Sequence, residues 1–67
     1  MYTPGYELKT DADFDNVIMF SLPIDVIYKD TGETEFSGFM IRHSDLACRF
    51  APRDTGYVKV THIFKVR

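Results

Sequence analysis

The chain is 67 residues long, carries a net charge of −2, and is 45% hydrophobic and 15% aromatic. A chain of this length forms one small domain, and this apolar content excludes an intrinsically disordered tail. Its one cysteine, Cys48, excludes an internal disulfide and a cysteine-rich zinc site. No apolar run approaches the roughly 18 residues of a membrane-spanning helix, and the first residues lack the pattern of a secretory signal. We therefore expect a cytoplasmic protein.

Acidic and basic residues are unevenly distributed along the chain. Residues 1–35 contain eight acids and two bases, whereas residues 36–67 contain two acids and six bases. Such asymmetry is typical of a protein with a basic binding face. It also arises when neighbouring strands of opposite charge pair in one sheet, so both interpretations stay open.

The first residues are expected to form an irregular arm. Pro4 and Gly5 favour a turn, and the acidic segment after them allows one helical turn, Ala12–Asn16, capped by Asp11. The apolar run Val17–Leu22 then predicts a strand. A short helix is the alternative, because periodicity does not distinguish the two in so short a run.

Two strands joined by a hairpin turn follow this run. The alternating segment Ile24–Lys29 predicts the first strand. Asp30–Glu33 predicts the turn, in which Gly32 can take the positive φ that such loops need. Thr34–His43 predicts a longer strand, and Gly38 inside it indicates a sharp bend or bulge.

The last third of the chain predicts two more strands. In the alternating segment Leu46–Phe50, the side chains of Leu46, Cys48 and Phe50 are expected to face the core. Alternation continues without interruption over Val58–Arg67, which predicts one long closing strand.

These segments predict a mainly β fold: a small, four- to five-stranded, strongly bent antiparallel barrel over residues 17–67. An irregular or one-turn helical arm, residues 1–16, precedes it. An apolar strand that ends in a polar turn, Asp25–Glu33, and the bent strand Phe36–Ile41 resemble those of the Sm-like small barrels. These include the bacterial Rho-termination inhibitor and YolD-like families. The resemblance implies non-catalytic binding to RNA or to a regulatory protein. Those families usually place a helix before the first strand.

Catalytic and metal sites are not expected. His43 and His62 could form a two-histidine, one-carboxylate metal site with Asp45, and either could activate Cys48 as a nucleophile. We interpret both histidines as structural and Cys48 as an inert core thiol, because it alternates with apolar residues. The sequence thus predicts no enzyme activity, no cofactor, no metal and no small-molecule substrate.

Two kinds of macromolecular partner remain. The first interpretation is a regulatory or inhibitory protein, of the type found among phage accessory proteins, that binds another protein or forms a homodimer. Its interface would consist of an apolar outer face and an acidic segment: Ile27, Phe39, Ile41, Ile63, Asp11, Asp13 and Asp15. The alternative is an RNA- or single-stranded nucleic-acid-binding barrel, with basic and aromatic contacts from Arg42, Arg49, Lys59, Lys65, Arg67 and Tyr57.

Overall fold

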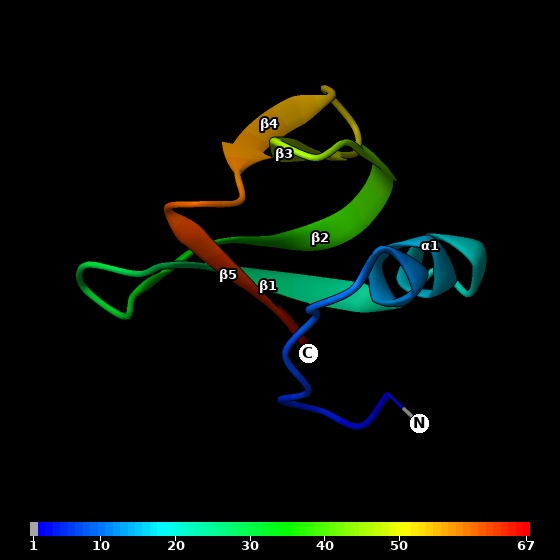
Figure 1. Cartoon of the computed structure of the whole chain (residues 1–67), viewed down its shortest axis with the longest axis horizontal. Helices are drawn as coiled ribbons and strands as arrows, with labels where there is room; N and C mark the ends of the chain where they lie inside the picture. Colours follow the sequence, from blue (N-terminus) through cyan, green and yellow to red (C-terminus); the bar gives the residue numbers. More distant parts are fainter. Residues whose placement is uncertain (1) are drawn as a thin grey trace.

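A computed structural model describes residues 2–67 as one helix followed by five antiparallel strands (Figure 1). The elements are α1 (Asp11–Met19), β1 (Pro23–Tyr28), β2 (Thr34–His43), β3 (Ala47–Phe50), β4 (Thr55–Val58) and β5 (His62–Val66). The strands form one sheet in the order β4-β3-β2-β1-β5. The mainly β prediction is therefore confirmed. The end strands β4 and β5 do not pair with each other, so the hydrogen-bonded sheet is open rather than a closed barrel.

Helix α1 spans the end of the predicted arm and the beginning of the run Val17–Leu22, for which a short helix is the alternative to a strand. Thr10, not Asp11, is the N-cap: its hydroxyl accepts a hydrogen bond from the Asp13 backbone N–H, and the Asp13 carboxylate accepts one from the Thr10 backbone N–H. This reciprocal cap begins a helix of nine residues that crosses the predicted boundary between residues 16 and 17. Within residues 2–67, no helix has the length and apolar content needed to span a bilayer.

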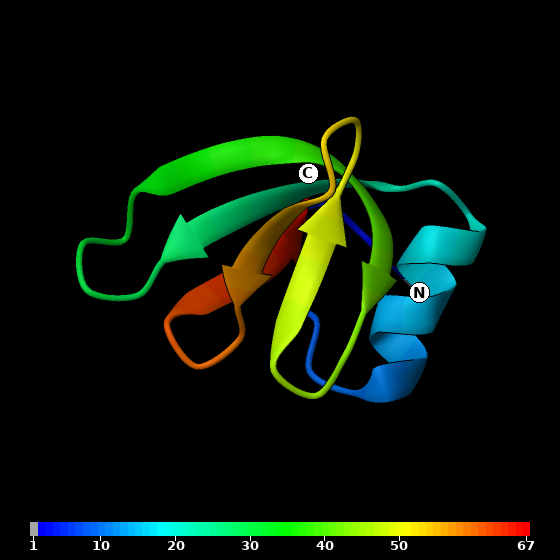
Figure 2. The same ribbon diagram turned by 90° about the horizontal axis from the view of Figure 1, so that it is seen from above.

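The central hairpin, formed by β1 and β2, agrees closely with the prediction. Strand β2 has the predicted bounds, and Gly32 in the turn before it has a φ of 73°. The pairing register of β2 shifts against β1 beside Val26 and against β3 after Met40. Such irregularities increase local twist, and β2 curls away from β1 to pair with β3 at its other end (Figure 2).

The predicted closing strand, Val58–Arg67, is right for β5 (His62–Val66) and wrong for its first residues, because the chain turns at Lys59–Thr61 and Val58 ends the separate strand β4. The turn contains neither glycine nor proline; its hydrogen bonds come from the Thr61 backbone N–H and hydroxyl, which both donate to the Val58 carbonyl. Val58 and Val60, predicted to face the core, are 46% and 73% exposed.

The core lies between the concave face of the sheet and the N-terminal segments. Five strand residues with no more than 2% exposure form its centre: Ile24, Val26, Cys48, Phe50 and Phe64. Leu8 from the arm and Phe14 and Val17 from α1 complete it. Leu46 does not face the core as predicted; it is 74% exposed, because β3 begins only at Ala47.

The N-terminal arm covers one edge of the sheet. The Gly5 and Leu8 backbone N–H groups donate to the carbonyls of Val66 and Phe64, and the Val66 N–H donates to the Tyr6 carbonyl. These bonds satisfy backbone groups of β5 that would otherwise be free. Strand β4 is thus the edge that no described segment covers.

Candidate functional site

The four apolar residues predicted to share an outer face do not form one patch. Ile27 and Ile63 lie opposite each other on β1 and β5 and are half-buried. Phe39 and Ile41 on β2 are 50% and 44% exposed. Phe39 lies opposite Pro23, four residues along β1 from Ile27. A polar pair separates these positions: the Ser37 hydroxyl donates to the Asp25 carboxylate at 2.6 Å.

Two further exposed apolar side chains lie at the C-terminal end of α1, an element that contacts β2. Met19 is 70% exposed and Phe20 is 62% exposed. Helix α1 contacts β2, and both views place its C-terminal end beside the bend of β2 (Figures 1 and 2). We call the four residues Met19, Phe20, Phe39 and Ile41 the helix-end patch. Aromatic residues and methionine are enriched in protein interfaces.

Two of the predicted basic residues lie together beside this patch. Arg42 and Arg49 are opposite each other on β2 and β3. The Arg42 guanidinium donates to the Asp54 carboxylate, and Arg49 Nη1 donates to the Asp54 carbonyl at 3.1 Å. Asp54 therefore orients two exposed guanidinium groups, that of Arg42 through its carboxylate and that of Arg49 through its backbone carbonyl.

The other nucleic-acid candidates are dispersed. Lys65 lies on β5 and Arg67 directly follows it, 3.9 Å from the Asp25 carboxylate. Lys59 lies on the opposite side of the sheet, 4.1 Å above the centre of the Phe14 ring. Tyr57 is only partly exposed, because its ring packs against the rings of Phe36, Phe50 and His62.

The three acidic candidates have three different environments. Asp11 is exposed in the first turn of α1. Asp15 is bound to His43, with 2.7 Å between Oδ1 and Nε2. Asp13 is only 7% exposed. Its carboxylate accepts hydrogen bonds from the Lys9 and Thr10 N–H groups and from the Tyr2 and Tyr6 hydroxyls. The Lys9 bond is the main reason that the pKa of Asp13 lies below its ordinary value of 3.8.

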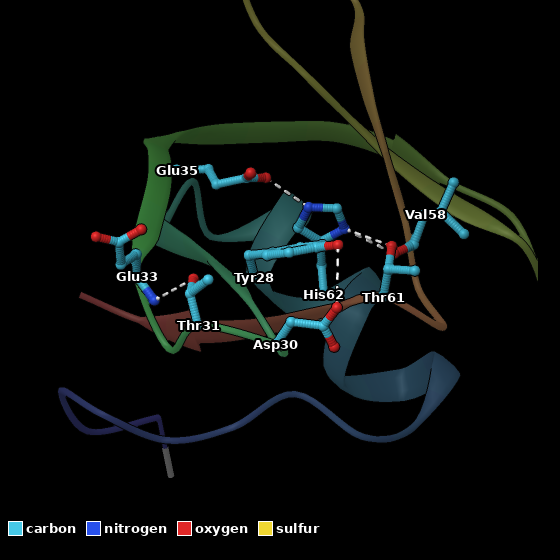
Figure 3. A network of polar contacts seen from close by, with 8 residues as sticks. All are labelled: Tyr28, Asp30, Thr31, Glu33, Glu35, Val58, Thr61 and His62. Atoms are coloured by element: carbon cyan, nitrogen blue, oxygen red, sulfur yellow. Dashed lines mark hydrogen bonds and ion pairs between the residues drawn. The ribbon is translucent and has the colours of Figure 1, made fainter.

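The two histidines belong to separate networks. His62 Nε2 lies 2.6 Å from the Glu35 carboxylate, and His62 Nδ1 lies 3.0 Å from the Val58 carbonyl (Figure 3). His43 contacts Asp15 through one ring nitrogen and Lys59 Nζ through the other. Within residues 2–67, no group of three or more potential ligands is placed to hold a metal ion.

Cys48 lies in the core and is fully buried. Burial raises the pKa of its thiol to about 11, although the nearby Lys59 charge acts in the opposite direction. A thiol in this environment stays protonated near neutral pH and is a poor nucleophile.

A hollow of about 270 Å³ lies between the arm and the beginning of β5. Nine residues line it, including lysines from three segments and several apolar residues: Glu7, Leu8, Lys9, Phe14, Lys29, Lys59, His62, Ile63 and Phe64. Among the predicted site residues only Lys59 and Ile63 belong to it. No local motif in the sequence indicates it, because the packing of the arm against β5 creates it.

The chain matches no protein-family model, no curated protein and no solved structure in the three comparisons made.

Proposed function

We propose that this protein is a non-catalytic binding protein that docks onto another protein through the helix-end patch. The observation that carries the proposal is the exposure of four large apolar side chains where α1 meets the bend of β2. Exposed apolar patches on small proteins are typical of interaction sites. Solvent exposure of these side chains has no benefit for the isolated fold.

The border of the patch favours a partner with acidic residues. Arg42 and Arg49 present two guanidinium groups beside Phe39 and Ile41, and Arg53 follows in the next turn. Asp54 offsets one of these charges, which leaves the border positive. Arginine is enriched in interfaces because its planar group makes several hydrogen bonds at once. We therefore expect carboxylates around an apolar groove on the partner.

The Sm-like resemblance remains part of this proposal at the level of fold. Three features support it: a helix before the first strand, a bent β2, and a core on the concave face of the sheet. Those families usually have such a helix, which the sequence predicts here only as one turn, Ala12–Asn16, and as the alternative for Val17–Leu22. The fold alone identifies neither the function nor the partner, so the proposal depends on the exposed patch.

Nucleic-acid binding is the weaker alternative. Tyr57 is enclosed by other rings, and the basic residues lie on different faces rather than along one groove. Single-strand binding normally combines a continuous positive groove with exposed aromatic platforms. A labelled oligonucleotide that is shifted by the wild-type protein at low salt, and not by Arg42→Ala, would favour this alternative.

The proposal is tested by cross-linking and affinity purification from the source cells, comparing wild type with the double variant Phe20→Ser, Phe39→Ser. We expect a protein that is captured by wild type and lost with the double variant, since central apolar contacts typically contribute most of the binding energy. Light scattering of the purified chain determines whether the partner is a second copy.

The matched control is Leu46→Ser, Val60→Ser. These side chains are also apolar and more than 70% exposed, but they lie in the turn before β3 and in the turn before β5. The control variant should retain the partner. Equal loss with both double variants, or a partner unaffected by either, would contradict the assignment to the helix-end patch.

A further inference from the structure

The hollow beside the arm concentrates positive charge on an acidic protein. Three of its nine lining residues are lysines from separate segments: Lys9 from the arm, Lys29 after β1, and Lys59 from the β4–β5 turn. Among the described residues that line it, Glu7 is the single acidic one, and it lies opposite Lys65, which places its side chain on the face of Lys65. The inner wall is apolar and includes Leu8, Phe14 and Phe64, all nearly inaccessible to solvent.

Within residues 2–67, these lysines form no ion pair with a carboxylate. Every ion pair in that range joins an acid to an arginine or a histidine; examples are Arg42 with Asp54 and His62 with Glu35. The positive charge that the three lysines bring to the lining is therefore not offset by direct carboxylate contacts, which favours the binding of an anion there.

The ammonium group of Lys59 is held in place by two contacts within the protein. Its Nζ lies 4.1 Å above the centre of the Phe14 ring and 3.4 Å from His43 Nδ1. Since a charged ammonium only donates, His43 Nδ1 accepts this hydrogen bond, and His43 Nε2 donates to Asp15. Asp15 thus orients His43, and His43 orients Lys59. An ammonium fixed before binding loses less entropy when an anion arrives.

We propose that the hollow is a binding site for a small anion: a carboxylate or phosphate group attached to a short apolar body. The ammonium groups would contact the anionic group, and the apolar body would lie against Leu8, Phe14 and Phe64. The volume of about 270 Å³ is below the range of roughly 300–1,000 Å³ found for drug-sized ligands, so a compact ligand fits best. The site shares no residue with the helix-end patch and is independent of the function proposed for it.

The site is tested by titrating the ¹⁵N-labelled protein with four probes and recording amide shifts: inorganic phosphate, phenyl phosphate, benzoate and neutral benzyl alcohol. We expect saturable shifts at Leu8, Lys59 and Ile63 with phenyl phosphate or benzoate, weaker shifts with phosphate, and none with benzyl alcohol. A preference for phenyl phosphate over benzoate identifies a phosphate-bearing ligand, and the reverse preference identifies a carboxylate.

Lys59→Met removes the charge and keeps an unbranched stem against Phe14. It should weaken binding at least about tenfold, the loss expected for one charge-assisted hydrogen bond. Lys65→Met, on the other face of β5, is the matched control and should bind as the wild type. Lys29→Met, at an exposed position, serves as a second variant if Lys59→Met does not fold. Equal shifts with benzyl alcohol, no saturation with any anion, or equal loss in the Lys65→Met control would overturn the proposal.

Discussion

The Asp13 carboxylate connects the arm to the beginning of α1. It accepts two backbone N–H bonds and two tyrosine hydroxyl bonds while only 7% exposed. A buried carboxylate is stable only when its oxygens are hydrogen-bonded. Asp13 therefore has a structural role, although the sequence places it among interface candidates, and Asn16 reinforces the same cluster by donating to the Tyr2 hydroxyl.

Asp13→Asn should destabilise the fold by about 1–3 kcal/mol near neutral pH. The asparagine side chain places an NH₂ donor where a carboxylate oxygen accepted hydrogen bonds, opposite groups that are themselves donors. The pKa of Asp13 is lowered in the folded state, so its contribution is complete above the ordinary value of 3.8 and is lost as the pH falls through the lower, folded value. Urea unfolding should therefore show wild type and variant converging as the pH is lowered below about 3.8.

Asp11→Asn is the control for this prediction. Asp11 lies in the same helical turn but is exposed, so its replacement should change the free energy of unfolding by no more than about 1 kcal/mol. A difference between wild type and Asp13→Asn that stays constant down to strongly acidic pH would contradict the role assigned to the carboxylate.

At the scale of elements, the packing of the Phe36 ring on β2 depends on the small size of Gly38. A Cβ atom at this position would lie 2.7 Å from Phe36 Cε2 and 2.9 Å from Phe36 Cζ. The Phe36 ring is itself packed against Phe50 and Tyr57, with ring centres 5.6 Å apart in both pairs. The ring thus occupies the space that a side chain at position 38 would need.

Gly38→Ala should lower the free energy of unfolding by about 1–3 kcal/mol, because the Phe36 ring must move into an already packed cluster. Chemical denaturation measures the change. Gly56→Ala is the matched control: its nearest contact would be the exposed Arg49 guanidinium at 3.4 Å, which can move aside. Similar stability of Gly38→Ala and wild type would show that the Phe36 ring is not fixed.

Local signals explain which elements the sequence predicts correctly. Strand β2 is predicted with its bounds because turn signals flank it on both sides. Helix α1 has a detectable signal, the Thr10 and Asp13 cap followed by Phe14 and Val17 on one face, but the alternating acids obscure it. The division of β4 from β5 has no comparable signal, since the alternation continues through Lys59–Thr61. The helix-end patch and the hollow depend on contacts between distant segments and are not predictable locally.

At the scale of the whole molecule, the arm, helix and sheet share one core. Leu8 is 5% exposed and packs with residues of α1 and the sheet. The arm also supplies hydrogen-bond partners to β5 through Gly5, Tyr6 and Leu8. A chain this small has little apolar area to spare, so loss of one arm contact should affect every element.

Leu8→Ala should therefore lower the free energy of unfolding by about 2–5 kcal/mol, the range for a leucine removed from a packed core. Leu46→Ala, the same change at a 74% exposed position, should alter it by no more than about 0.5 kcal/mol. Hydrogen exchange at the Val66 amide, which donates to the Tyr6 carbonyl, adds a second measurement. If arm and sheet unfold together, Leu8→Ala should accelerate exchange at Val66 and at Val26 in the centre of β1 by the same factor. Faster exchange at Val66 alone would show that the arm detaches while the sheet stays folded.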